Sequence, residues 1–252
     1  MNELATLTVS GAVATLELNR AEQRNALSLE LLETLHARLD ELERGDGIAV
    51  LVLTGKGRAF CAGMDLRQVL IGASREQWPG PALLESLARL TLRLRRLGMV
   101  VVASVNGAAI GGGCGLACVA DIAITHADAR IGFPEVDLGL CPAVVAPWVV
   151  RKLGAGKARR VLLTGGVMSG AEAHAIGLVD HLAESADDLP QRTSELVERL
   201  STGGMQALRA TKRLLNELDG SDDEHAVLAG ARLSAEVLGS DEAQRALAAR
   251  RS

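Results

Sequence analysis

Aromatic residues are scarce in this chain of 252 residues, and tyrosine is absent. Two Phe and two Trp make up the 2% of aromatic residues, whereas hydrophobic residues reach 48%. The core must therefore be aliphatic, and the length suits one substantial domain or a domain with a small appendage. A surface that stacks nucleic-acid bases on aromatic rings needs more rings than this composition provides.

Long runs of one charge or of apolar residues are also missing. The 27 basic and 31 acidic residues give a formal net charge of −4 and are mixed along the chain. This mixing argues against nucleic acid or a membrane surface as a partner. No apolar run is long enough to span a membrane, and the first residues lack the pattern of a signal peptide. We therefore expect a cytoplasmic protein.

Cysteine is rare, and its spacing does not suggest a metal site or a disulfide framework. The four cysteines contain no C-x-x-C pair, and no His lies beside them at ligand spacing: Cys61, Cys114, Cys118 and Cys141. We predict that all four are reduced, small and buried.

Several nucleotide and hydrolase motifs are absent or incomplete. The glycine fingerprint of dinucleotide-binding proteins begins at Gly111 and Gly113 but has Leu116 in the third place. Glu135 lies near the spacing of a ribose-binding acid, so a nicotinamide-dependent oxidoreductase remains a weak alternative. The chain has no complete P-loop and no Gly-x-Ser-x-Gly elbow of a serine hydrolase.

Hydrophobic periodicity predicts strands that alternate with helices over the first two thirds of the chain. The expected strands cover 6–18 (two strands with a turn at 10–11), 48–53, 99–105, 119–125 and 131–133. The expected helices cover 29–43, 65–70 and 82–97, with Ser28 as an N-cap and 72–81 as a looser stretch. From about residue 143 the chain is mostly helical, and from about 191 it has no strand signal. This order favours an α/β fold with largely parallel pairing.

A glycine-rich run, Gly111-Gly112-Gly113-Cys114-Gly115, lies between a β-branched segment and a short helical one. Glycine lets backbone N–H groups approach a ligand closely, and the first N–H groups of a helix have no acceptor within the helix. They attract negative charge. The run is therefore a candidate anion or oxyanion site.

Three ordered segments resemble the enoyl-CoA hydratase/isomerase (crotonase) superfamily. They are Asn19-Arg20 with Asn25-Ala26-Leu27-Ser28, then 57–66 (GRAFCAGMDL), and then 105–114 (VNGAAIGGGC) continuing to Asp121-Ile122. The likeness covers about residues 5–220, and 138–147 is closest in pattern to bacterial branched-chain (methylglutaconyl-CoA-type) hydratases. The resemblance implies an α/β spiral of ββα units as an acyl-CoA-binding core (1–190). It also implies a helical trimerisation region (191–252) in a homotrimer or dimer of trimers.

The resemblance also implies a site for an acyl-CoA thioester, with no metal or redox cofactor. Coenzyme A enters as part of the substrate. Backbone N–H groups of Cys61 and Gly112 would hold the thioester oxygen, and Glu135 would move protons. The substrate-binding positions would be Arg24, Ala59, Cys61, Ala62, Gly63, Met64, Asp65, Leu66, Gly111, Gly112 and Gly115. Preorganised N–H donors suit an enolate, because its charge develops only during the reaction.

For three of these residues, the residue chemistry leaves a second interpretation open. Asp65 suits a helix N-cap better than a ligand contact, and Arg24 suits a solvated surface equally well. A nucleophilic thiol at Cys61 is not favoured, because no His partner is evident nearby.

Gly115 departs from the two-glutamate pattern of many hydratases in the family, which leaves Glu135 alone. An apolar setting would raise the pKa of Glu135 towards neutrality, whereas a surface salt bridge is the alternative role. We expect a hydratase of a short or branched 2-enoyl-CoA. The alternatives are a Δ3-Δ2-enoyl-CoA isomerase with Glu135 as sole proton shuttle and a non-catalytic CoA-binding paralogue. Asp137 is a possible second acid, in a segment expected to be extended.

Overall fold

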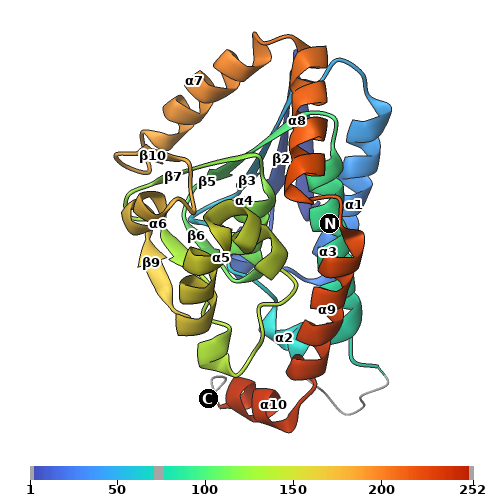
Figure 1. Ribbon diagram of the computed structural model, residues 1–252, viewed down its shortest axis with the longest axis vertical. Coiled ribbons are helices and arrows are strands. Elements are labelled where there is room, and N and C mark those ends of the chain that lie inside the picture. Colours follow the sequence, from blue (N-terminus) through green and yellow to red (C-terminus); the bar gives the residue numbers. More distant parts are fainter. Residues whose placement is uncertain (1–2, 71–76, 250–252) are drawn as a thin grey trace.

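The computed structural model describes residues 3–70 and 77–249, which form two sheets surrounded by helices (Figure 1). The larger sheet has the strand order β1-β2-β3-β5-β7-β10, in which only β1 and β2 pair antiparallel. Its strands are β1 (Ala5–Ser10), β2 (Val13–Leu18), β3 (Val50–Gly55), β5 (Val100–Val105), β7 (Ile122–His126) and β10 (His181–Ala183).

The smaller sheet has the order β4-β6-β8-β9, and its first three strands are parallel. They are β4 (Ala59–Cys61), β6 (Ala108–Ile110) and β8 (Arg130–Gly132), followed by the antiparallel β9 (Val167–Ser169). Three times in succession the chain adds one strand to the larger sheet and the next strand to the smaller one, as β3–β4, β5–β6 and β7–β8. This succession is the expected α/β spiral.

Ten helices and two short 3-10 turns complete the described part of the chain. The helices are α1 (Leu29–Arg44), α2 (Leu66–Val69), α3 (Gly80–Arg96), α4 (Gly112–Val119), α5 (Ala146–Thr164), α6 (Gly170–Ile176), α7 (Leu189–Ser201), α8 (Met205–Asp219), α9 (Glu224–Leu238) and α10 (Asp241–Ala248). The 3-10 turns are η1 (Ala21–Gln23) and η2 (Val136–Leu138). The predicted cap of α1 is confirmed, because the Ser28 hydroxyl accepts a hydrogen bond from the Leu31 N–H at 3.2 Å.

Strand β3 is buried on both faces, as its continuous apolar run predicts. Leu51 and Leu53 belong to the main aliphatic core with α1 and α3. Val50 and Val52 belong to a second cluster that includes Leu189 and Val197 of α7. Helix α7 therefore covers the face of the larger sheet that the earlier helices leave open.

The C-terminal helices pack back onto the spiral. Helix α9 lies beside α3, and α10 lies at the end of the molecule near the C-terminus (Figure 1). The last strand, β10, ends at Ala183, so the predicted strand-free tail is confirmed up to residue 249. The boundary at 190 and the trimerisation role of this region stay predictions.

Periodicity missed most of the smaller sheet. Strands β4 and β6 fall in segments where no strand was predicted, and β9 and β10 fall in a region expected to be helical. Each has three residues, too few for alternation to be recognised, and each is held by pairing with distant strands. Two boundaries were also wrong: α3 begins at Gly80, and β7 begins at Ile122 because α4 continues to Val119. The looser stretch expected at 72–81 lies outside the described residues as far as residue 76.

Candidate active site

The smaller sheet brings three of the sequence-predicted residues to one edge. Cys61 is the last residue of β4, Gly112 comes two residues after β6, and Glu135 comes three residues after β8. Cys61 pairs with Ala109, and Ile110 pairs with Gly132. Because these strands are parallel, their carboxyl ends meet at the same edge, where open α/β sheets bind ligands.

Glycines allow the backbones at this edge to touch. A Cβ atom at Gly113 would lie 2.2 Å from the Cys61 carbonyl oxygen, and one at Gly63 would lie 2.8 Å from the Ile110 oxygen. Gly63 also has a φ of +86°, which side chains other than glycine rarely adopt. The segment after β4 therefore lies directly against the segment after β6.

The start of α4 presents N–H groups at this contact. Gly112 is the first residue of α4, and its N-cap, Gly111, has no side chain to cap the helix. N–H groups of a first helical turn have no acceptor within the helix. The neighbouring Gly111 N–H is bound to the Gly132 carbonyl at 2.8 Å, and the Ala62 N–H to the Arg24 carbonyl at 3.0 Å. The oxyanion role of the Cys61 and Gly112 N–H groups stays a prediction.

Glu135 lies buried against the same glycine turn. The residue is 8% exposed, and its Oε1 atom lies 2.6 Å from where a Cβ of Gly111 would be. Its Oε2 atom is buried and has no hydrogen-bond partner within residues 3–70 and 77–249. Burial raises the pKa of Glu135 to about 7, as the apolar setting predicted. The surface salt-bridge alternative was wrong, and this carboxyl can exchange protons near neutral pH.

Most of the other predicted substrate-binding residues belong to two segments that lie side by side, one around Arg24 and the other at 59–66. The Leu27 N–H donates to the Gly63 carbonyl at 2.7 Å, and the Asp65 N–H donates to the Leu27 carbonyl at 2.9 Å. Their burial differs: Arg24 and Leu66 are exposed, Ala62 and Met64 are half-buried, and Ala59 is buried in β4. Their contacts with a substrate stay predictions.

Asp65 caps α2, which is the structural role that its sequence context favoured. Its Oδ1 atom accepts from the Arg67 N–H at 3.1 Å, and Oδ2 lies 3.1 Å from the Arg20 guanidinium. Burial alone would raise the pKa of Asp65, but hydrogen bonds from Arg67 and Arg20 hold it below its ordinary value. Asp65 is therefore an anionic capping residue.

The thiol of Cys61 is unsuited to nucleophilic chemistry. Burial raises its pKa to about 12, so the thiolate is scarce at neutral pH. All four cysteines are free thiols, as predicted, although Cys141 is half-buried rather than buried.

The structure shows the surroundings of the two positions that bear on a second acid, Gly115 and Asp137. A Cβ at Gly115 would lie 2.2 Å from Cγ1 of Val145, so Val145 fills the space beside this glycine. Val145 lies in the segment 138–147 that carries the subgroup likeness, but sequence reasoning missed its contact with Gly115, because that contact joins residues distant in sequence. Asp137 lies in the 3-10 turn η2 rather than in an extended segment, since the Leu138 N–H bonds back to the Glu135 carbonyl. Its carboxylate is exposed and accepts from the Gly166 N–H at 2.9 Å.

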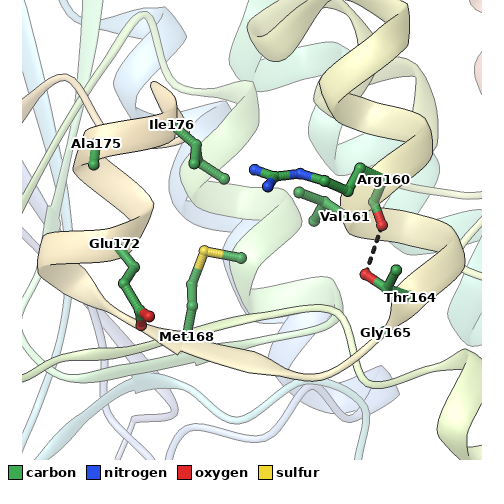
Figure 2. A pocket seen from close by; sticks show the side chains of 8 residues that line it. All are labelled: Arg160, Val161, Thr164, Gly165, Met168, Glu172, Ala175 and Ile176. Atoms are coloured by element: carbon green, nitrogen blue, oxygen red, sulfur yellow. Dashed lines mark hydrogen bonds between the residues drawn. The ribbon is translucent and has the colours of Figure 1, made fainter.

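A separate cavity of about 470 Å³ lies between the end of α5 and the β9–α6 segment (Figure 2). Figure 2 shows Arg160 of α5 reaching across towards Ile176 of α6, with Met168 between the two helices and Glu172 at the opposite side. Glu172 is engaged in the capping box of α6 with Ser169. None of the sequence-predicted site residues lines this cavity.

The described residues contain no group of three or more His, Cys, Asp or Glu side chains placed to hold a metal ion. None of their helices combines the length and the hydropathy of a membrane span.

Comparison with known proteins identifies the class. Residues 8–250 match the family model described as enoyl-CoA hydratase/isomerase, and the chain belongs to this family. A Thermus thermophilus protein named "Putative enoyl-CoA hydratase" is 38% identical over 214 residues, which cover 83% of each chain. The 2,3-dehydroadipyl-CoA hydratase of Escherichia coli is 32% identical over 206 residues, covering 81% of this chain and 78% of the relative.

A solved structure of an enoyl-CoA hydratase from Mycobacterium avium is similar over nearly the whole chain. Its TM-score is 0.85 at 29% identity, and the match covers 99% of this chain and 96% of the other. The two-sheet spiral is therefore the fold of this family, with the C-terminal helices included.

Proposed function

We propose that this chain is an enoyl-CoA hydratase, which adds water across the C2–C3 double bond of a 2-enoyl-CoA. The observation that carries the proposal is the buried Glu135 carboxyl, with a pKa raised to about 7, against the glycine turn that starts α4. The names of the relatives support the same reaction. A neutral-range carboxyl beside helix N–H groups suits a reaction that moves one proton and builds charge on an oxygen.

In the proposed mechanism the thioester oxygen lies between the N–H groups of Cys61 and Gly112. The water oxygen bonds to C3, and the π electrons move towards the thioester oxygen to form an enolate. The carboxylate of Glu135 takes a proton from this water and delivers a proton to C2, which restores the carboxylate and the thioester. Removing one oxyanion donor costs about 3 kcal/mol in comparable sites, so these donors are a major part of the proposed catalysis.

The proposal includes how the substrate is held. Arg24 and the segment 59–66 contact the CoA portion, and Gly111 to Gly115 face the thioester end. No resident metal or redox cofactor takes part, and coenzyme A is present only as part of the substrate. We propose a short or branched acyl group.

The experiment compares crotonyl-CoA, 3-methylglutaconyl-CoA, 2,3-dehydroadipyl-CoA and a 3-enoyl-CoA with the wild-type protein and Glu135→Gln. We expect hydration of at least one 2-enoyl-CoA by the wild type and its loss in the variant. The single carboxylate also favours a second candidate, Δ3-Δ2-enoyl-CoA isomerase, and turnover of only the 3-enoyl-CoA would establish it. Binding of CoA esters without turnover would contradict both activities and point to a non-catalytic paralogue.

We also propose a cytoplasmic homotrimer or dimer of trimers. Helix α8 supports the assembly, because Leu214, Leu215 and Leu218 are 53%, 55% and 74% exposed. Such an apolar surface is typical of a subunit interface. Sedimentation equilibrium of the wild type and of Leu215→Asp with Leu218→Asp tests this assembly. We expect three or six subunits for the wild type and smaller species for the variant, whereas a monomeric wild type would contradict the proposal.

A further inference from the structure

Helix α4 begins with two side-chain-free positions on one face. Gly111 is its N-cap, and the Gly115 N–H donates to the Gly111 carbonyl at 2.9 Å. This hydrogen bond closes the first turn of α4, so the two glycines lie about 6 Å apart along the axis. Gly111, whose φ of +54° lies outside the helical region, and Gly115 at the end of this turn are here called the glycine face of α4.

One side chain from another element lies against each of these two glycines. Oε1 of Glu135 lies 2.6 Å from where a Cβ of Gly111 would be. Cγ1 and Cβ of Val145 lie 2.2 Å and 2.8 Å from where a Cβ of Gly115 would be. The carboxyl thus lies against the first glycine of this face and the isopropyl group against the second.

We propose that Val145 is a positioning residue for Glu135: it closes the Gly115 side of the carboxyl pocket with an apolar group. This closure keeps water and any second acid away from that side of Glu135. The inference rests on the proposed function in one respect only, which is that Glu135 is the group that moves protons.

The backbone holds Val145 in place. The residue is fully buried, and its N–H donates to the Pro142 carbonyl at 3.2 Å. Its own carbonyl accepts from the Trp148 N–H at 3.1 Å, and Trp148 is also fully buried. Val145 therefore sits in a turn that anchors the start of α5. The buried Oε2 of Glu135 has no hydrogen-bond partner among the described residues.

Desolvation, rather than a nearby charge, raises the pKa of Glu135. On α4 the neighbouring Cys114 is a neutral thiol, because burial and a hydrogen bond with the Cys118 thiol raise its pKa well above the ordinary value. On α5, Arg151 and Lys152 bind the Gly220 carbonyl and Asp180. The carboxylate of Asp137 on η2 accepts from Gly166, and the charged residues of α10 are exposed: Asp241, Glu242 and Arg245. The apolar side chain of Val145 is therefore the feature that the experiments change.

The first experiment is Val145→Thr, which adds a hydroxyl with little change in shape. The matched control is Val144→Thr, at the adjacent buried valine. The readout is the titration of the Glu135 carboxyl by NMR of protein labelled with ¹³C at glutamate carboxyls, assigned by its absence in Glu135→Gln. We expect the midpoint to fall from about 7 towards the ordinary glutamate value in Val145→Thr and to stay unchanged in Val144→Thr.

A folded Val145→Thr protein with an unchanged midpoint would overturn the inference. This titration needs no turnover, so it is independent of whether the hydratase proposal holds. Conversely, an enzyme that depends on Glu135 but has an unshifted midpoint in Val145→Thr would leave the proposed function intact and remove the role of Val145.

The second experiment tests the packing and does not depend on the first. Gly115→Ala should lower the thermal midpoint, because its Cβ would overlap Val145. Adding Val145→Gly should restore that midpoint. Gly115→Glu with Val145→Gly should place a second carboxyl beside Glu135 and raise the titration midpoint of the pair. A stable Gly115→Ala protein, or no rescue by Val145→Gly, would contradict the inferred contact.

Discussion

The two sheets of this protein are built from different kinds of sequence. In the larger sheet, β3 and β5 are six-residue strands with apolar side chains buried on both faces. In the smaller sheet, β4, β6 and β8 have three residues each, and glycines or a buried carboxyl follow their ends. The larger sheet therefore provides stability, whereas the smaller sheet provides the backbone contacts of the candidate site. Substitutions in the two sheets should separate folding from activity.

The largest expected effect is on activity, at the edge of the smaller sheet. Glu135→Gln should lower kcat for hydration by about 10²- to 10⁴-fold, the usual contribution of a general acid–base group. Its thermal midpoint at neutral pH should not fall, because a neutral amide replaces a buried carboxyl that has an unbonded oxygen. Steady-state kinetics and thermal unfolding measure the two quantities. A variant with full activity would remove Glu135 from the mechanism.

A substitution in the larger sheet should lower stability and leave activity nearly unchanged. Leu51→Ala in β3 should lower the free energy of unfolding by about 2–5 kcal/mol, because it leaves a cavity in a fully buried core. Activity per folded molecule should change less than twofold. Denaturant unfolding and active-site-normalised kinetics would test this separation. A large loss of kcat in the folded variant would mean that the two sheets are coupled.

The pH dependence of stability tests the cost of keeping Glu135 buried at the edge of the smaller sheet. The folded-state pKa of Glu135 is raised to about 7 from an ordinary 4.5, so its deprotonation opposes folding. Below about pH 4.5 the difference in free energy of unfolding between the wild type and Glu135→Gln is constant. As the pH rises through 7, the wild type loses stability relative to the variant. The loss approaches about 3 kcal/mol, since each unit of pKa shift corresponds to about 1.4 kcal/mol.

Urea unfolding of both proteins between pH 4.5 and 8.5 measures this loss. Because the proposed mechanism uses the carboxylate, kcat should rise over the same pH interval. A constant stability difference between wild type and Glu135→Gln would mean that Glu135 titrates equally in the folded and unfolded states.

The smallest effect is expected at Cys61. Cys61→Ala keeps the backbone N–H and removes only the thiol, so kcat should stay within a few-fold of the wild type. The free energy of unfolding should fall by about 1 kcal/mol, as for a typical single substitution. Gly113→Ala is the contrasting variant, since its Cβ would overlap the Cys61 carbonyl and displace the backbone. A loss of more than 100-fold in Cys61→Ala would assign a role to the thiol.

The sequence predicts a region well where the structure of that region depends on a local pattern of residues. The apolar run of β3 and the Ser28 cap of α1 are local patterns, and both were predicted. Strands β4, β6, β9 and β10 carry no such pattern and were missed. Glu135 was found through the ordered motifs of its family, whereas the motif segment 138–147 gave no sign that Val145 contacts Gly115.

The sequence by itself determined the α/β class, the aliphatic core and the set of segments that mark the family. These properties depend on neighbours in the chain and on the order of motifs. The tertiary structure decided that Cys61, Gly112 and Glu135 share one sheet edge, because parallel strands far apart in sequence end there together. It also decided the raised pKa of Glu135 and the place of Val145 beside Gly115. Desolvation and steric fit depend on surrounding atoms that only folding brings together.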